Sequence, residues 1–239
     1  MVQHNLSACF ASPLFRISGD CTLLVEYGQD IDPVLNEKVR HLALLIQKKD
    51  CGAIREIIPS YSTLALRYEP AKIKVEELKT LIISLESSQI TAAVPKVRVV
   101  EIPVCYGGDF GPDMADVTQH TGLHVDEVIK RHSAPLYRIY AIGFAPGFCY
   151  LGGLDHKLHI QRLASPRLKV ATGSVGIADG QTGVYPQESP GGWRIIGRTP
   201  LCLFDPTKKE PTLYQAGDSI RFCPISPQDF SALAKREEP

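Results

Sequence analysis

The distribution of glycine is the strongest constraint on the fold. Residues 143–199 contain 11 of the 19 glycines in less than a quarter of the chain. Glycine weakens helix interiors and supplies the tight turns that connect short strands. Five aromatic residues also fall within the fourteen positions 137–150. This part of the chain is therefore predicted to form a barrel or sandwich of short strands.

The first third of the chain has a different pattern, which predicts a small α+β domain. The motif Asp32-Pro33 predicts the start of a helix, and apolar residues at helical spacing continue it to a stop at Gly52. The remaining elements are strands at 14–18, 22–27, 54–58 and 63–68, and a helix at 75–87. This ββαββα order predicts an antiparallel sheet with both helices on one face.

The predicted domain boundary lies within residues 87–95, which gives an N-terminal domain of residues 1–95 and a mainly-β domain of residues 96–239. A strand near 97–104 and two short helices at 113–120 and 125–132 are expected to open the second domain. The 44% hydrophobic content supplies enough apolar surface for a large core.

Charge and cysteine usage narrow the class of protein. The chain has 26 basic and 26 acidic residues, and this balance argues against a nucleic-acid or membrane-surface binder. Seven cysteines without any CxxC spacing predict reduced thiols in a cytoplasmic protein. No export signal or spanning segment is predicted, because the uncharged stretch 139–154 contains Pro146 and four glycines.

Several common catalytic patterns are absent from the sequence. There is no P-loop, no dinucleotide-binding glycine motif after a strand, no HExxH and no GxSxG. The histidines lack metal-ligand spacing, so each is predicted to be a surface residue and no metal site is expected. His132 alone is kept as a candidate for substrate binding.

The segment 143–154, with the sequence GFAPGFCYLGGL, is the strongest local feature. Its glycines and Pro146 force a tight backbone, and Phe144, Phe148 and Tyr150 can form a flat wall beside the exposed N–H groups near Gly147. Such a loop suits a carboxylate or amide ligand. The alternative is a barrel corner whose aromatic side chains fill the core. Cys149 is expected to fill space rather than act as a nucleophile.

A second segment, residues 173–186, combines a predicted strand, a turn at Asp179-Gly180 and neutral hydrogen-bonding side chains. These side chains are candidates to bind an amide, or else they satisfy backbone groups. They belong to Ser174, Gln181, Thr182 and Tyr185.

Three arginines are candidates to hold an anion. Arg167 follows Ser165-Pro166, and its planar guanidinium suits a carboxylate or phosphate. Arg194 and Arg198 flank a predicted strand after the only tryptophan, Trp193. The alternatives are a surface position for Arg167, ion pairs of the other two arginines with Glu188 and Asp205, and a core position for Trp193.

Four motifs together resemble one family. They are GFAPGFCYLGGLD (143–155), SPR (165–167), GSVGIADGQTGVYPQESPGGW (173–193) and IIGRTP (195–200). The chain is similar to the family of the 5-oxoprolinase B subunit, the kinase inhibitor KipI and allophanate hydrolase subunit 1, also described as carboxyltransferase subdomain C and D. It also resembles part of the carboxyltransferase domain of urea carboxylase. The resemblance implies a cyclophilin-like β-barrel for residues 96–239.

The resemblance also implies a function. The usual member acts with a C subunit and an A subunit to cleave 5-oxoproline to glutamate with ATP and magnesium, and is inactive alone. Which subunit holds ATP is left open. On this hypothesis ATP phosphorylates the lactam oxygen before water attacks.

Each motif residue then has an expected role. Arg167 and Arg198 stabilise developing charge, Gln181 and Tyr185 bind the lactam, and the other candidates contact substrate. Those contacts are Phe144, Pro146, Gly147, Phe148, Tyr150, Ser174, Thr182, Trp193, Arg194 and His132.

Two alternative functions stay open at this point. A KipI-like protein binds a sensor histidine kinase through a surface and needs no chemistry of its own. A protein that processes urea or allophanate would need biotin from a partner, because the chain lacks a Met-Lys-Met carrier motif.

Overall fold

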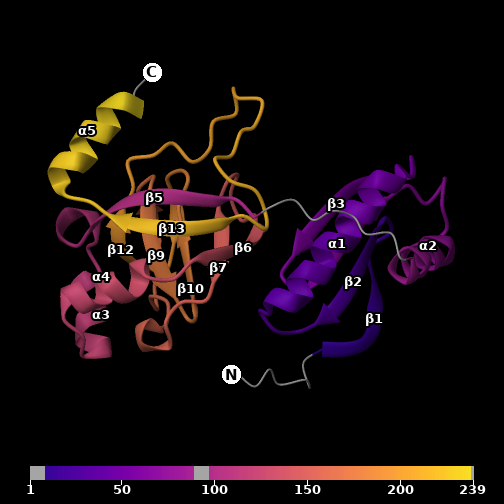
Figure 1. The fold of residues 1–239 in the computed structure, drawn as a ribbon, viewed down its shortest axis with the longest axis horizontal. Coiled ribbons are helices and arrows are strands. Elements are labelled where there is room, and N and C mark those ends of the chain that lie inside the picture. The colour runs from indigo at the N-terminus through magenta and orange to yellow at the C-terminus, as the bar shows by residue number, and fades with distance from the viewer. Residues whose placement is uncertain (1–8, 89–96, 238–239) are drawn as a thin grey trace. The chain divides into compact units, whose positions relative to one another are not determined.

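The computed structural model describes residues 9–88 and 97–237. Its contacts divide the chain into two compact units, Met1–Lys96 and Val97–Pro239. The predicted boundary segment 87–95 falls mostly on residues 89–96, which lie outside the described residues. Figure 1 shows a sheet with two helices in the first unit and a barrel with outer helices in the second.

The first unit has the predicted ββαββα order. Its sheet is antiparallel, with strand order β1-β2-β4-β3, and α1 packs against β2, β3 and β4 while α2 packs against α1. The elements are β1 (Cys9–Ser18), β2 (Thr22–Gly28), α1 (Pro33–Lys49), β3 (Ile54–Ser60), β4 (Thr63–Tyr68) and α2 (Val75–Ser87).

Alternating side chains of the central strands form this unit's core. Leu23 and Val25 of β2 and Leu64 and Leu66 of β4 are fully buried, because every second residue of a strand points to the same face. The helices add an apolar stripe at helical spacing, so the unit has a core of its own.

Helix α1 begins as predicted but ends differently. The Asp32 carboxylate accepts hydrogen bonds from the N–H groups of Val34 (2.7 Å) and Leu35 (3.0 Å) and so caps the first turn. The helix stops at Asp50, which takes the left-handed conformation (φ 48°). The prediction that Gly52 would stop the helix is therefore wrong by two residues.

The second unit is built around a closed barrel with strand order β10-β7-β6-β13-β5-β12-β9. All pairs are antiparallel except β5 with β13. The barrel strands are β5 (Val99–Tyr106), β6 (Tyr137–Ile142), β7 (Cys149–Gly152), β9 (Ser174–Ala178), β10 (Gln181–Val184), β12 (Arg194–Arg198) and β13 (Ser219–Pro224).

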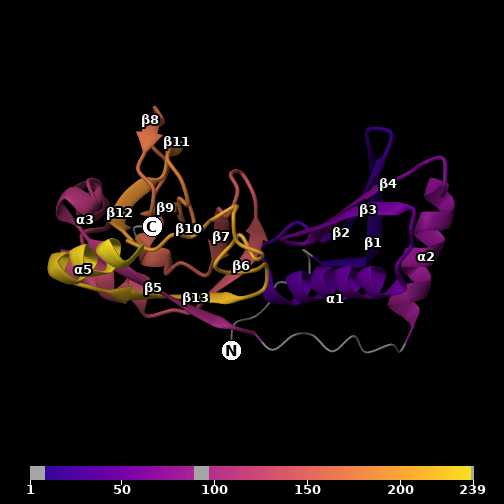
Figure 2. The ribbon, with the colours of Figure 1, turned by 90° about the horizontal axis from the view of Figure 1, so that it is seen from above.

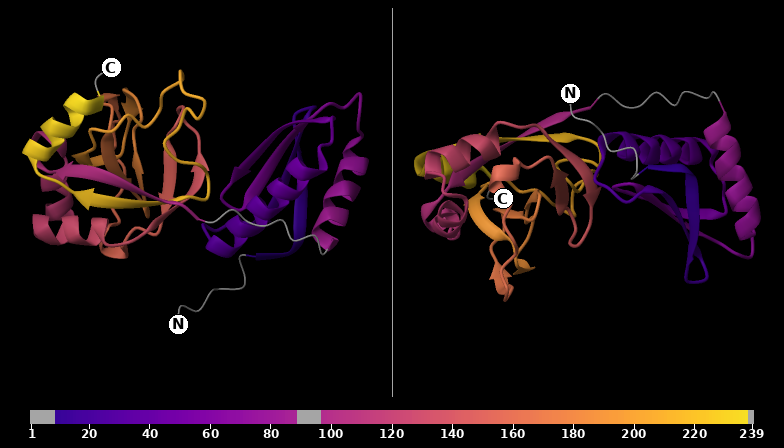
Figure 3. Two further views of the ribbon diagram at one scale, coloured as in Figure 1. Left: turned by 45° about the horizontal axis from the view of Figure 1, so that its top comes forward. Right: turned by 90° about the horizontal axis from the view of Figure 1, so that it is seen from below.

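Helices and a separate ribbon lie outside the barrel. β8 (Arg167–Val170) and β11 (Ser189–Gly191) pair with each other and project from the barrel, as Figures 2 and 3 both show. The outer helices are α3 (Met114–Thr121), α4 (Val125–Ser133), α5 (Pro227–Glu237), and the short η2 (Gly108–Phe110) and η3 (His156–Leu158).

The main features of the predicted fold class are confirmed. The structure has the antiparallel sheet with two helices, the two short helices and a barrel of short strands. The expected strand at 97–104 is β5, and it belongs to the barrel. The closer likeness to cyclophilin stays a prediction.

Candidate functional site

Five aromatic side chains of the barrel unit gather around one cavity of about 330 Å³, here called the aromatic pocket. The motifs at 143–154 and 173–193 contain all five. They are Phe144, Phe148, Tyr150, Tyr185 and Trp193. The lining is completed by Arg162, Pro166, Pro190, Gly191 and Gly192.

Phe148 lies at the centre of these rings. Its ring meets the other four edge to face, with centroid separations of 5.4 Å to Phe144, 4.9 Å to Tyr150, 5.3 Å to Tyr185 and 5.6 Å to Trp193. Edge-to-face contacts are the favourable arrangement for aromatic quadrupoles. The rings therefore support one another and hold a fixed apolar wall.

The loop before β7 holds Phe144 at the pocket. Phe144 takes a left-handed backbone conformation (φ 73°) and leaves 66% of its surface exposed. Its neighbours fix the loop: Gly143 N–H donates to the Phe148 carbonyl (3.0 Å), and the Tyr214 hydroxyl donates to the Gly147 carbonyl (2.7 Å). A strained, exposed aromatic residue on a fixed loop is typical of a binding site.

One glycine of the PGGW motif makes room for Tyr185. A Cβ atom on Gly191 would lie 2.4 Å from the Tyr185 hydroxyl oxygen, whereas one on Gly192 would meet nothing closer than 3.6 Å. Only Gly191 is therefore required to be glycine by this packing.

The two phenols of the pocket stay protonated at neutral pH. Burial raises the pKa of both Tyr185 and Tyr150, although the positive charge of Arg162 acts in the opposite direction.

Arg162 supplies the positive charge of the pocket, and the sequence analysis missed it. Its guanidinium lies 6.0 Å from the centre of the Trp193 ring and pairs with Asp179 at 3.3 Å, while 57% of the side chain stays exposed. An exposed ion pair of this kind is weak, so Arg162 can exchange its partner for a ligand carboxylate. No local motif surrounds Arg162, and only the folded barrel brings it to Trp193.

Arg167, which is predicted to bind an anion, pairs with a carboxylate of the protein itself. The Arg167 guanidinium binds both carboxylate oxygens of Asp113, at 2.9 and 2.5 Å, and Asp113 is almost fully buried. The same carboxylate accepts the N–H of Ile195 at 2.6 Å. This arrangement ties β8 to β12, so Arg167 is held by the protein itself.

The other two arginines also have partners, though not the expected ones. Arg194 pairs with Asp116 at 2.5 Å, and Arg198 donates to the Thr172 carbonyl at 2.7 Å. The alternative pairing with Glu188 and Asp205 is wrong. Those carboxylates pair with Lys169 and Lys208, respectively.

The side chain of His132, on α4, is fully buried against the barrel strands, so the prediction of a surface histidine is wrong for this residue. The Thr182 hydroxyl donates to the Gly176 carbonyl (3.0 Å) and therefore accepts from His132 Nε2 (2.8 Å). His132 Nδ1 then accepts from the Tyr106 hydroxyl (2.7 Å). Burial lowers the pKa of the imidazole to about 3, so the ring is neutral and fully used in packing.

The remaining predicted residues are not brought to the aromatic pocket. Ser174 and Thr182 are buried in the barrel strands, Gln181 is half-buried at the start of β10, and Pro146 and Gly147 shape the loop without lining the cavity. Their expected contacts with substrate stay predictions. Their observed contribution is to the backbone that carries the aromatic rings.

The described residues contain no group of three or more His, Cys, Asp or Glu that could hold a metal ion. Burial raises the pKa of the Cys149 thiol to about 11, which leaves it protonated and inert as a nucleophile.

Within residues 9–88 and 97–237, no helix is long and apolar enough to cross a membrane.

Known proteins are similar to this chain over most of its length. The pattern of the carboxyltransferase domain, subdomain C and D, matches residues 13–214. The chain is 38% identical over 224 residues to the 5-oxoprolinase B subunit of Bacillus subtilis (strain 168), covering 90% of this chain and 93% of that protein. It is 41% identical over 208 residues to the 5-oxoprolinase B subunit of Escherichia coli O157:H7, covering 86% of this chain and 93% of that protein.

A solved structure shares the fold at low sequence identity. The urea carboxylase of Kluyveromyces lactis superposes with a TM-score of 0.75 at 19% identity, covering 97% of this chain and 24% of that chain. The match of the domain pattern and the two relatives lead to one conclusion. The chain belongs to the family of the carboxyltransferase domain, subdomain C and D.

Proposed function

We propose that this chain is the B subunit of an ATP-dependent 5-oxoprolinase, which acts with A and C subunits to cleave 5-oxo-L-proline to L-glutamate. One observation carries this proposal. The chain is 38% and 41% identical to two proteins named as the B subunit of 5-oxoprolinase and spans 93% of the length of each. Identity over nearly the whole chain supports a shared role more strongly than a single motif does.

The aromatic pocket is the proposed binding site for 5-oxoproline. This substrate is a flat five-membered lactam with one carboxylate, and the pocket offers flat apolar walls beside one exposed guanidinium, that of Arg162. The protonated phenols of Tyr150 and Tyr185 are the proposed hydrogen-bonding groups for the lactam amide. Aromatic walls of this kind also exclude water from the amide.

Recognition and chemistry are divided between the chain and ATP in this proposal. ATP with magnesium transfers its γ-phosphoryl group to the lactam oxygen, and water adds to the activated carbon. The carbon–nitrogen bond then breaks as the nitrogen takes a proton, which leaves an acyl phosphate, and a second water hydrolyses it to the side-chain carboxylate of glutamate and inorganic phosphate. In this proposal the chain is inactive without its partner subunits.

Reconstitution tests the subunit role. The chain is co-expressed with its A and C partners, and ATP-dependent formation of glutamate from 5-oxoproline is compared with a preparation that lacks this chain. Turnover that disappears with the omission is expected. A soluble, assembled complex without turnover would favour a urea-type substrate, and failure to assemble would favour the kinase-binding function.

A matched pair of variants tests the proposed substrate site in the assembled enzyme. Arg162→Gln removes the guanidinium beside Trp193, and we expect the KM for 5-oxoproline to rise about tenfold, as for loss of one charge-assisted hydrogen bond. Arg221→Gln is the control, because Arg221 forms an exposed ion pair of the same 3.3 Å length with Glu101 and does not line the pocket. Equal KM values for both variants would place the substrate elsewhere.

The urea-type alternative has weaker support. It rests on the likeness to urea carboxylase at 19% identity, which shows the fold alone.

A further inference from the structure

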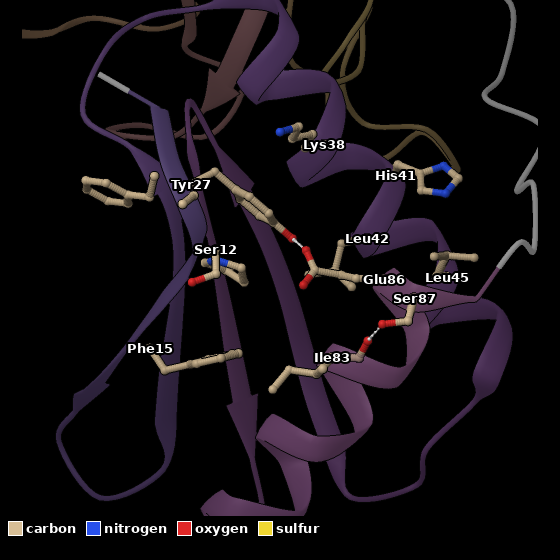
Figure 4. A pocket seen from close by; sticks show the side chains of 13 residues that line it. Ser12, Phe15, Tyr27, Lys38, His41, Leu42, Leu45, Ile83, Glu86 and Ser87 are labelled. Carbon is tan, nitrogen blue, oxygen red and sulfur yellow. Dashed lines mark hydrogen bonds between the residues drawn. The ribbon is translucent and has the colours of Figure 1, made fainter. Parts of the chain in front are cut away.

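The first unit contains a cavity of about 550 Å³ that the proposed reaction does not use, here called the sheet-edge pocket. Its walls come from residues 10–13 of β1, from Tyr27 of β2, and from one face each of α1 and α2. Figure 4 shows Tyr27 reaching from the sheet toward Glu86 of α2 across this space. The volume is that of a site for a small organic molecule.

An irregularity of the edge strand opens this pocket. Cys9 pairs with Gly28, but the next paired residue of β1 is Leu14, opposite Glu26. Four residues of β1 therefore stand opposite Tyr27 alone, and Pro13 among them has no N–H group to donate to the ladder. The bulged segment leaves room between itself and the helices. Bulges of this kind are over-represented beside functional sites.

Apolar residues contribute to the lining on the sheet and on both helices. Ile83 of α2 keeps 51% of its surface exposed at this pocket, although it is a large aliphatic residue. Covering such a surface with an apolar group removes it from water and is favourable. The other apolar residues are Phe10, Ala11, Pro13, Phe15, Leu42 and Leu45.

The two charged side chains of the pocket, Glu86 and Lys38, differ in their protein partners. The Tyr27 hydroxyl donates to the Glu86 carboxylate, and burial together with this bond raises the pKa of Tyr27, so the phenol stays protonated and the carboxylate keeps its donor. Lys38 forms no hydrogen bond or ion pair with any of residues 9–88 and 97–237, and Figure 4 shows its side chain beside the pocket. His41 follows one turn later on α1. The pocket therefore holds one carboxylate that has a protein donor and one ammonium group that has no partner among the described residues of the protein.

We propose that the sheet-edge pocket binds a small amphiphilic anion, with an apolar aliphatic or aromatic body and a single carboxylate. The body lies against Leu42, Leu45 and Ile83, and the carboxylate binds the Lys38 ammonium group at the rim. The combination of an apolar lining and one free cation selects for both parts of such a ligand. This site is separate from the aromatic pocket and does not depend on the proposed function.

Octanoate is the probe for this proposal, titrated into the full 239-residue chain and observed through backbone amide shifts. Octanol provides the apolar body without the charge, and acetate provides the charge without the body. Saturable shifts by octanoate at Lys38, Leu42 and Ile83 are expected, with weaker binding of octanol and no shifts there by acetate at the same concentration. Octanol binding as tight as octanoate binding, or octanoate shifts confined to other residues, would overturn the proposal.

Two lysines of the same helix provide the matched variants. Lys38→Gln is expected to weaken octanoate binding about tenfold and to leave octanol binding unchanged. Lys48→Gln changes a lysine in the last turn of α1 that does not line the pocket, and both affinities should stay as in the original chain. Equal octanoate affinity in the two variants would exclude Lys38 as the anion contact. Both lysines are exposed, so neither substitution disturbs the core.

Discussion

His132 is a single residue on which the packing of the barrel depends. Both of its ring nitrogens are hydrogen-bonded, and its ring stacks on Phe222 with 4.6 Å between the centroids. Its pKa of about 3 lies below the ordinary value of 6.5. Between these two pH values the imidazole binds a proton in the unfolded chain but not in the native protein. The contribution of His132 to the free energy of unfolding is therefore complete above pH 6.5 and is lost as the pH falls toward 3.

We expect His132→Leu to remove this pH dependence. In the original chain, each unit by which the pH falls from 6.5 to 3 lowers the free energy of unfolding by up to about 1.4 kcal/mol through this group. The variant lacks that contribution, and at pH 7 it is less stable by about 2 kcal/mol because Tyr106 and Thr182 lose their partner. Urea unfolding at several pH values, followed by the fluorescence of Trp193, measures both effects. Parallel pH profiles for the two proteins would contradict this account.

Adjacent glycines of the aromatic pocket give a second test at the residue scale. Gly191→Ala places a methyl group against the Tyr185 phenol, and we expect a loss of about 1–3 kcal/mol in unfolding free energy and altered Trp193 fluorescence. Gly192→Ala has room for its methyl group and should change the unfolding free energy little. Urea titration of both variants measures the difference, and similar losses would show that Tyr185 moves aside at little cost.

Among the elements, α1 shows where the sequence predicted the structure and where it did not. Its start follows from Asp32-Pro33, because a cap and a fixed φ angle are local properties. Its end depends on which residue takes the left-handed conformation, and that residue is Asp50 although Gly52 adopts this conformation at lower cost. Local propensity therefore predicted the element but not its last residue.

Replacing that aspartate is expected to stabilise the protein. Asp50→Gly relieves the left-handed conformation at the end of α1, and we expect a gain of about 0.5–1 kcal/mol in the free energy of unfolding. Gly52→Ala serves as the comparison, because its backbone is outside the left-handed region and no atom lies within 4 Å of the added methyl group. Thermal unfolding of the two variants measures both changes. Destabilisation by Asp50→Gly would show that the aspartate side chain has a structural role.

The same reasoning explains what the sequence revealed of the candidate site. The aromatic residues of the pocket occur within two glycine-rich motifs, so a local pattern was enough to find them. The partners of the arginines could not be predicted from local patterns. Asp113 is 54 residues from Arg167 and Asp116 is 78 residues from Arg194, and Arg162 meets Trp193 only in the closed barrel. Partners so distant in the chain leave no periodic signal.

At the scale of the whole molecule, the described residues form three clusters of buried apolar side chains. One fills the space between the sheet and its helices in the first unit, and the other two belong to the second unit, where one fills the barrel and one includes rings of the aromatic pocket. Leu78 of α2 belongs to the cluster of the first unit and is fully buried. Units with their own cores are expected to unfold separately.

Hydrogen exchange read by mass spectrometry tests this separation. Leu78→Ala is expected to destabilise the first unit by about 2–5 kcal/mol and to speed exchange in β2 and β4. Exchange in β9 and β10 should stay as in the original chain. Faster exchange in both units at once would show that they unfold together.

The parallel pairing of β5 with β13 has a consequence for the way the protein is made. β13 lies between β5 and β6 in the barrel, yet the ribosome synthesises it after every other strand. A growing chain therefore carries two unpaired strand edges through most of the translation of the second unit, and such edges associate readily with other strands. We expect this unit to depend on chaperones until residue 224 has emerged, whereas the first unit can complete its sheet while translation continues.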